Sequence, residues 1–106
     1  MTHPLTAPSD RPLVIGHRGA MAMAPENTLA SFREAIAQGA DGLECDVHLT
    51  RDGQVVVMHD FTLDRTTEGA GAIAAHTLAE LRRLEAGSWY DARFAGEPVP
   101  TLAQTL

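Results

Sequence analysis

The chain has 106 residues, of which 44% are hydrophobic and 21% charged, a composition typical of one modest globular domain and not of a disordered or fibrous chain. Its formal net charge of -6, without any basic run, excludes a protein that coats nucleic acid or an anionic membrane. The single cysteine, Cys45, excludes an internal disulfide and is typical of a reducing compartment.

The first twelve residues predict a flexible lead-in. They contain Pro4, Pro8 and Asp10 but no apolar core, so we expect no secretory signal in this segment. No apolar run in the sequence approaches the length of a membrane span. With the single cysteine, these features favour a cytoplasmic protein without a membrane span.

The next segment predicts a buried strand that ends in reactive side chains. Leu13-Val14-Ile15 is a short apolar run bounded by Gly16, and His17-Arg18-Gly19 follows directly. In parallel α/β folds, reactive groups gather where strands end, and a guanidinium suits a phosphate or a carboxylate. The alternative is that His17 and Arg18 lie on an ordinary surface turn.

A helix and a second strand follow. Asn27 is the expected N-cap of a helix that runs through Gln38 and stops at Gly39, with an apolar stripe of Leu29, Phe32 and Ile36. We expect Glu26 to favour the helix N-terminus electrostatically. The second strand covers residues 42–47, and the resulting βαβ unit predicts a parallel pair with a right-handed crossover.

Two carboxylates lie two residues apart in this second strand. Side chains alternate along a strand, so Glu44 and Asp46 are expected on the same side, with Cys45 opposite as a small buried hydrophobe. Anionic side chains on a packed face need a counter charge, and a hard cation with oxygen ligands is the first hypothesis. The alternative is a solvated strand end whose acid pairs with an arginine.

A third strand is predicted at Val55 to Met58, after a turn at Asp52-Gly53, and it ends in His59-Asp60. The three strands thus each deliver polar side chains near their C-terminal ends, and we expect these side chains to converge at a common rim of parallel strands. Two imidazoles, a guanidinium and a carboxylate pair are suited to proton transfer around an anionic phosphorus centre.

The remaining sequence predicts connectors and packing. Residues 63–71 form either a loop over the site or a plain connector, and Thr77 to Glu80 is a capping box for a short helix that stops near Gly87. Thr101 is the expected N-cap of a last helix. The aromatic residues Trp89, Tyr90 and Phe94 are expected to pack. His48 and His76 are expected to be structural or exposed.

Six motifs in order resemble the N-terminal part of the glycerophosphodiester phosphodiesterase family. They are His17-Arg18-Gly19, Pro25-Glu26-Asn27-Thr28, Glu44-Cys45-Asp46-Val47, His59-Asp60, Leu63-Asp64-Arg65-Thr66-Thr67 and the segment from Gly96 to Leu102. The resemblance implies an α/β domain over residues 13–106 that consists of the N-terminal βα units of a TIM-type (β/α)8 barrel, incomplete here with about three strands. It also implies metal-dependent hydrolysis of glycerophosphodiesters to an alcohol and glycerol 3-phosphate.

The resemblance also implies roles for the site residues. Residues matching Glu44 and Asp46 bind a divalent cation, Ca²⁺ or Mg²⁺, in that family, those matching His17 and His59 are the general acid and base, and the one matching Arg18 contacts the phosphate. In the family, a later strand adds a further carboxylate ligand and a lysine. These 106 residues supply neither.

Two other functions stay open at this point. The chain is alternatively a truncated, non-catalytic fragment that needs a partner or a C-terminal part, and an open sheet edge would then favour self-association. The second alternative is a related phospholipase-D-like activity on lysophospholipids, which would use a similar set of histidines and carboxylates. For the phosphodiesterase function, the expected binding partner is a small glycerophosphodiester substrate, and no nucleic-acid partner is expected.

Overall fold

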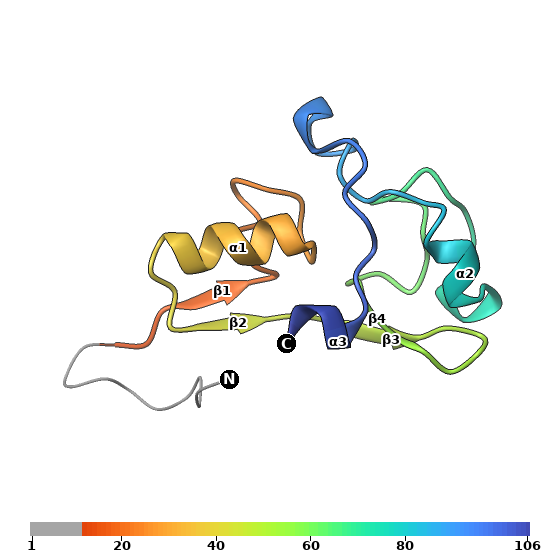
Figure 1. Ribbon diagram of the computed structural model, residues 1–106, viewed down its shortest axis with the longest axis horizontal. Helices are drawn as coiled ribbons and strands as arrows, with labels where there is room; N and C mark the ends of the chain where they lie inside the picture. The colour runs from red at the N-terminus through yellow and green to blue at the C-terminus, as the bar shows by residue number, and fades with distance from the viewer. Residues whose placement is uncertain (1–11) are drawn as a thin grey trace.

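The computed structural model describes residues 12–106, so all of the predicted lead-in except Pro12 lies outside the described residues. Figure 1 shows short strands and helices joined by long connections. No helix in the described part is long and apolar enough to cross a membrane. The elements are β1 (Ile15–His17), α1 (Leu29–Ala37), β2 (Gly42–Glu44), β3 (Val47–Leu49), β4 (Val55–Val57), α2 (Leu78–Leu81) and α3 (Leu102–Thr105), with 3-10 turns at Ile73–Ala75 and Ala92–Phe94.

The predicted parallel pair is present. β1 and β2 are joined through α1 and pair in parallel, with Ile15 opposite Gly42 and His17 opposite Glu44. In Figure 1, α1 lies along one side of this pair. Phe32 and Ala35 are the buried apolar residues of α1, whereas Ile36, predicted to share the apolar stripe, is 62% exposed. The parallel register places the C-terminal ends of β1 and β2 side by side.

The ends of α1 follow local capping chemistry. Thr28, not Asn27, is the N-cap: its hydroxyl accepts a hydrogen bond from the Ser31 backbone N–H. The helix ends at Ala37, and Gly39 follows at a φ of +90°, as predicted for a helix stop. The prediction for Asn27 was wrong because this residue has its own left-handed backbone, with φ +54°, and a separate partner in the site.

The prediction that the third strand shares a rim of parallel strands was also wrong. β4 pairs with β3 in antiparallel fashion, with Val47 opposite Val57 and Leu49 opposite Val55. The physical reason is the length of the connection, because a parallel partner needs a crossover of about a dozen residues or more. The turn here is tight: the Thr50 N–H donates to the Gln54 carbonyl, and Gly53 has a φ of +77°.

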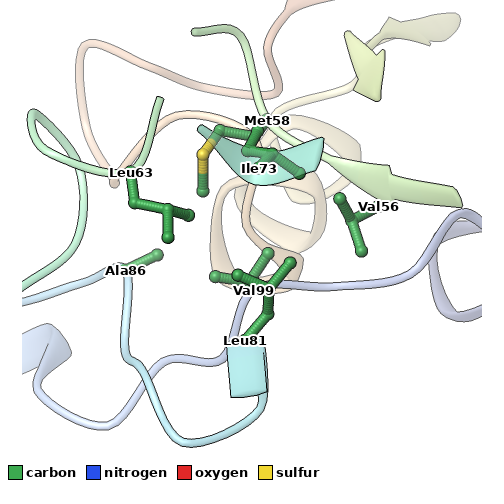
Figure 2. Close-up of a cluster of buried hydrophobic side chains, with 7 residues drawn as sticks. All are labelled: Val56, Met58, Leu63, Ile73, Leu81, Ala86 and Val99. Carbon is green, nitrogen blue, oxygen red and sulfur yellow. The ribbon is translucent and has the colours of Figure 1, made fainter. Parts of the chain in front are cut away.

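The main hydrophobic core lies between β4 and the C-terminal half of the chain. Figure 2 shows these side chains converging from β4, α2 and the connecting segments. Leu63, Leu81 and Val56 are completely buried, so the segment after His59 is anchored by packing. The full set is Val56, Met58, Leu63, Ile73, Leu81, Ala86 and Val99.

Candidate active site

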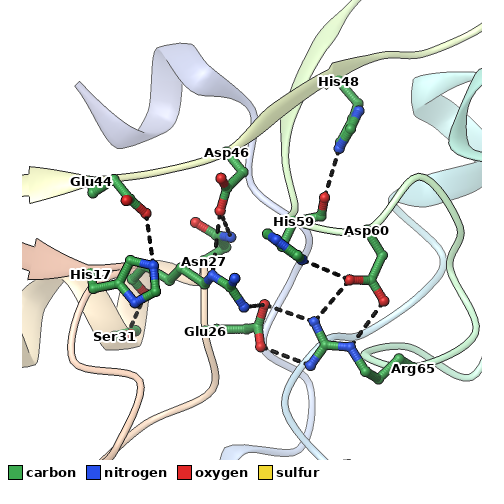
Figure 3. Close-up of polar contacts among 11 residues, drawn as sticks. His17, Glu26, Asn27, Ser31, Glu44, Asp46, His48, His59, Asp60 and Arg65 are labelled. Carbon is green, nitrogen blue, oxygen red and sulfur yellow. Dashed lines mark hydrogen bonds and ion pairs between the residues drawn. The ribbon is translucent and has the colours of Figure 1, made fainter.

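The first pair of site residues lies at the ends of the two parallel strands. His17 closes β1 and Glu44 closes β2, and the register sets them opposite each other. The His17 Nε2 atom lies 3.4 Å from Glu44 Oε1. Both side chains are about half exposed, so this contact leaves each of them accessible to a ligand (Figure 3).

Arg18 is held by an unusual backbone geometry. Its φ is +54°, a left-handed value that non-glycine residues rarely adopt and that often marks a functional site. The Arg18 carbonyl accepts hydrogen bonds from the Asn27 N–H at 2.9 Å and the Ser31 hydroxyl at 3.0 Å. Gly19 follows at φ +85°, where any Cβ would clash with Ser31. The turn after β1 is therefore fixed against the start of α1.

The Arg18 guanidinium lies between two carboxylates. Nη1 donates to Glu26 Oε2 at 3.2 Å, and Nε lies 3.6 Å from Asp46 Oδ2. The side chain is 17% exposed, so the cation is partly withdrawn from water. An anionic group that enters here would meet a guanidinium already oriented by acidic neighbours.

Glu26 has a role that the sequence reasoning missed. We expected it to favour the helix N-terminus, but its side chain is only 3% exposed and binds two arginines. Arg65 Nη1 and Nη2 donate to Oε1 and Oε2 of Glu26 at 2.8 and 3.0 Å, in addition to the contact with Arg18. A buried carboxylate without a counter charge would be strongly destabilising, and the two guanidinium groups supply that charge. The expectation about Glu26 was wrong for this reason.

His59 belongs to a second polar group. Its Nδ1 lies 2.9 Å from Asp60 Oδ1, and Asp60 also accepts two hydrogen bonds from Arg65 at 2.9 and 3.0 Å. The Arg65 hydrogen bonds, and then that of His59, hold the pKa of the Asp60 carboxyl well below its usual range. Asp60 is consequently an ionised, acceptor-only group beside the imidazole.

His48 contacts the backbone of His59. From the sequence, His48 is expected to be structural or exposed. His48 Nε2 lies 2.9 Å from the His59 carbonyl oxygen, so this nitrogen is the donor. The His48 ring also packs against Phe61, with centroids 4.7 Å apart. The structural assignment of His48 is thus confirmed, and its contact is with the segment that carries His59.

The two predicted metal ligands lie on the same side of the chain, but the single strand predicted over residues 42–47 is interrupted: Glu44 closes β2, and Asp46 lies between β2 and β3. In Figure 3, Glu44 and Asp46 both point toward His17 and Asn27. Asn27 is buried, and its Nδ2 donates to Asp46 Oδ2 at 3.1 Å. Within the described part of the chain, Asn27 Oδ1 and Arg18 Nε are the buried side-chain atoms that lack a hydrogen-bond partner, and both lie in residues that contact Asp46.

This donor set fits a hard cation, although it does not complete its coordination. Carboxylate oxygens are preferred ligands of Ca²⁺ and Mg²⁺, and the orphan Asn27 carbonyl oxygen offers an acceptor for a cation-bound water. Residues 12–106 contain no group of three or more histidine, cysteine or carboxylate side chains placed to hold a metal. Glu44 and Asp46 therefore supply only part of the coordination shell that such a cation needs.

Cys45 lies between the two acids but is not suited to chemistry. Burial first, and then the negative charges of Asp46 and Glu44, raise the pKa of its thiol. A thiol that stays protonated is a poor nucleophile and a poor metal ligand. This agrees with the expectation of a small hydrophobe, although Cys45 is only partly buried.

Three of the five predicted site residues, Arg18, Asp46 and His59, belong to one linked set. Ion pairs connect Asp46 to Arg18, Arg18 to Glu26, Glu26 to Arg65, and Arg65 to Asp60, which contacts His59. His17 and Glu44 form a separate pair beside them. Sequence reasoning missed Glu26, Asn27, Asp60 and Arg65, although each lies inside a motif that we had singled out.

Comparison with solved structures defines the class of fold. A glycerophosphodiester phosphodiesterase from Agrobacterium tumefaciens matches with a TM-score of 0.86 and 47% identity over 87% of this chain and 40% of its own. A phosphodiesterase from Oleispira antarctica, solved in complex with the product sn-glycerol-3-phosphate, matches with a TM-score of 0.86 and 49% identity over 89% of this chain and 38% of its own. The described residues form the N-terminal part of such a TIM-type barrel, with few of its strands.

Sequence comparison then gives the family. The model described as "Glycerophosphoryl diester phosphodiesterase family" matches residues 17–106. A glycerophosphodiester phosphodiesterase from Caldanaerobacter subterraneus subsp. tengcongensis is 52% identical over 94 residues, which is 89% of this chain and 39% of the relative. The chain belongs to the glycerophosphoryl diester phosphodiesterase family, and it spans about two fifths of the length of these relatives.

Proposed function

We propose that residues 12–106 contain catalytic residues of a metal-dependent phosphoric diester hydrolase that cleaves glycerophosphodiesters to an alcohol and glycerol 3-phosphate. The observation that carries the proposal is the linked set of ion pairs that runs from Asp46 through Arg18 to Asp60 and His59. Membership of the family and a relative solved with its product sn-glycerol-3-phosphate support the substrate class.

The histidines have environments suited to general acid and base chemistry. His17 contacts a carboxylate at 3.4 Å and His59 contacts another at 2.9 Å, and both rings remain exposed enough to meet a ligand. An imidazole changes its protonation near neutral pH, so one can accept a proton while the other donates one. His17 and His59 are therefore assigned to the two ends of the reaction.

The proposed reaction has two steps. One histidine removes the proton of a neighbouring glycerol hydroxyl, whose oxygen forms a bond to phosphorus while the bond from phosphorus to the alcohol oxygen breaks. The second histidine gives its proton to that departing oxygen, which leaves a cyclic phosphate. Water then opens the ring with the proton transfers reversed, so that each histidine returns to its starting state.

Arg18 and the two acids have the remaining roles. Arg18 is placed to bind the phosphate, because its guanidinium is partly withdrawn from water and already oriented by Glu26. Glu44 and Asp46 would hold a divalent cation, Ca²⁺ or Mg²⁺, which when bound supplies positive charge to the phosphoryl oxygens. A reducing, cytoplasmic location belongs to the same proposal, since the lone Cys45 cannot form an internal disulfide.

Purified chain incubated with glycerophosphocholine or glycerophosphoethanolamine tests the proposal. We expect release of choline or ethanolamine with Ca²⁺ or Mg²⁺ present, and loss of that release in EDTA. A sizing run on the same sample shows which species is active. Hydrolysis that continues in excess EDTA, or no hydrolysis with any divalent cation, would contradict the proposal for this chain.

A second candidate is a fragment that acts only with a complementing polypeptide. It is favoured by the apolar side chains that the two small sheets expose, namely Ile15, Val47 and Leu49. Monomeric turnover would remove this candidate. Activity that needs the rest of a relative's barrel, added as a separate polypeptide, would establish it.

A further inference from the structure

The Arg65 guanidinium joins two segments that are far apart in the sequence. Nη1 and Nη2 donate to the two carboxylate oxygens of Glu26 at 2.8 and 3.0 Å, while Nε and Nη2 donate to those of Asp60 at 2.9 and 3.0 Å (Figure 3). A planar guanidinium with five donors can bind two carboxylates at once, whereas a lysine ammonium cannot reproduce that fork. Arg65 therefore fixes the separation between Glu26 and Asp60.

Trp89 further limits the orientation of Arg65. The Arg65 Cζ atom lies over the Trp89 ring, 5.8 Å from its centroid, a cation–π geometry. The ring is itself held, because Trp89 Nε1 donates to the Ala86 carbonyl at 2.9 Å, and Ala86 belongs to the hydrophobic core. The orientation of the guanidinium is thus restrained both by the two carboxylates and by Trp89, which is anchored to the hydrophobic core.

The contact between Asp60 and His59 has a consequence for the imidazole. An ionised carboxylate has no proton to donate, so the 2.9 Å contact between Asp60 Oδ1 and His59 Nδ1 requires a proton on Nδ1. In the neutral ring, Nε2 is then unprotonated. The tautomer of a histidine is set in this way by the partner of its other nitrogen.

We propose that Arg65 is a positioning residue for His59. By holding Asp60 against the buried Glu26, it keeps the His59 ring in the Nδ1–H tautomer and leaves Nε2 as the atom that exchanges protons. Because Glu26 also binds Arg18, the same guanidinium sets the spacing between the phosphate-binding group and the proton-transfer group. The catalytic consequence rests on the proposed function, whereas the tautomer of His59 does not.

The tautomer is measured by ¹⁵N NMR of the nitrogens of the neutral imidazole in the full chain, with His59→Gln used to assign the signals. In the wild type we expect a protonated Nδ1 and an unprotonated Nε2. In Arg65→Ala we expect loss of this pattern and a mixture dominated by Nε2–H. Arg51→Ala is the matched control, because Arg51 pairs with Glu80 in another part of the chain and should leave the pattern unchanged.

Two outcomes overturn the proposal: an Nε2–H tautomer in the wild type, or a wild-type pattern in folded Arg65→Ala. Folding is checked by the methyl signals of the buried Leu63 and Leu81. If Arg65→Ala does not fold, the same measurement is made on Arg65→Lys, because lysine keeps the positive charge but lacks the planar guanidinium that binds two carboxylates at once. Loss of the Nδ1–H pattern in Arg65→Lys supports the proposal, and retention of it overturns the proposal.

Kinetics separate this inference from the proposed function. With glycerophosphocholine as substrate, we expect Arg65→Lys to lower kcat at least tenfold while KM changes less than threefold, since substrate binding by Arg18 persists. Equal losses in both parameters would contradict a positioning role. If the wild-type chain does not hydrolyse the substrate at all, the proposed function fails for this chain and the NMR pattern alone decides the role of Arg65.

Discussion

The Nε2 atom of His17 lies 3.4 Å from Oε1 of Glu44, and the two residues are direct partners in the parallel register of β1 and β2. The strand pairing itself thus brings an imidazole next to a carboxylate, without any loop between them. This relationship matters because Glu44, which contacts His17, is also proposed to bind a cation. A cation bound at Glu44 would lie close to one of the two proposed proton-transfer groups.

Replacing either histidine should remove turnover without removing the cation. His17→Ala and His59→Ala each delete a proton-transfer group, and general acid–base catalysis is typically worth about 10²–10⁴-fold in rate. Hydrolysis of glycerophosphocholine and calorimetric titration with Ca²⁺ measure the two effects separately. His76→Ala is the control, since His76 contacts Glu80 outside the site. An active double variant, His17→Ala with His59→Ala, would refute the assignment.

The affinity for a divalent cation should depend on Glu44 and Asp46, and on the Asn27 amide that orients Asp46. Glu44→Gln and Asp46→Asn each remove a charged ligand, so we expect titration with Ca²⁺ to show little or no binding. Asn27→Gly removes the hydrogen bond to Asp46 while it tolerates the φ of +54°. Loss of such an orienting partner should weaken binding by about 10–100-fold. Unchanged affinity in Asp46→Asn would contradict the metal site.

The approximate positions of the strands were predictable, because short apolar runs followed by His17, Arg18 and His59 are visible in the sequence. The predicted burial of the first strand was wrong: β1 includes His17, and Val14 and Ile15 are 53% and 42% exposed. The parallel pairing of β1 with β2 followed from the helix between them. The antiparallel direction of β4 was also predictable, since the turn at Asp52-Gly53 is too short for a parallel crossover.

The inner partners of the site were not predictable from local patterns. Glu26 precedes a helix, and a carboxylate there normally favours the helix N-terminus, whereas here its partner Arg65 lies 39 residues away. Asn27 has the residue type of an N-cap, but Thr28 takes that position. In both cases a long-range contact overrides a local preference, and a single sequence contains no signal for the pairing.

The pair of His76 and Glu80 should make stability depend on pH. His76 Nδ1 contacts Glu80 at 2.9 Å, and Nε2 contacts the Ala70 carbonyl at 3.1 Å, so both nitrogens donate when the ring is protonated. The Glu80 hydrogen bond, and then the Ala70 carbonyl, raise the pKa of His76 above its ordinary 6.5, against the opposing effects of desolvation and of the Arg51 charge. The stabilisation is therefore complete below pH 6.5 and is lost as the pH rises through the raised pKa.

Urea unfolding at several pH values tests whether this stabilisation decreases as the pH rises. The difference in midpoint between the wild type and His76→Gln should be largest near pH 6 and should shrink toward pH 8. Glu80→Gln should reduce the same difference, because it removes the first cause of the raised pKa. A difference that grows with pH would show that the sign is wrong.

Ser31 should be important for stability because it joins α1 to the turn that carries Arg18. Its hydroxyl accepts from the Ala20 N–H at 2.7 Å and donates to the Arg18 carbonyl at 3.0 Å, and the residue is completely buried. Ser31→Ala removes both hydrogen bonds, each worth about 0.5–1.5 kcal/mol in the free energy of unfolding. The Ala20 N–H keeps the Ser31 carbonyl as a partner, and the Arg18 carbonyl keeps the Asn27 N–H, so neither group is left unsatisfied. The exposed Ser88→Ala is the control, expected within about 0.5 kcal/mol of the wild type. Equal stability of the two variants would contradict this role.

The open sheets should make the isolated chain associate. Among residues 12–106 each sheet has two strands. The outer edge of β4 is bridged to Thr101, whereas β3 has no second strand partner and presents Leu49 at 59% exposure. Unpaired edges with apolar side chains are sites of intermolecular strand pairing, and a charged side chain on the edge opposes it. Sedimentation velocity should show a mass that rises with protein concentration, and Leu49→Lys should reduce that rise. Ile36→Lys, on the exposed face of α1, adds the same charge away from any strand and should leave association unchanged. If both variants reduce association equally, the contact is not through the strand edge, and if the wild type stays monomeric at all concentrations, the sheets need no further partner.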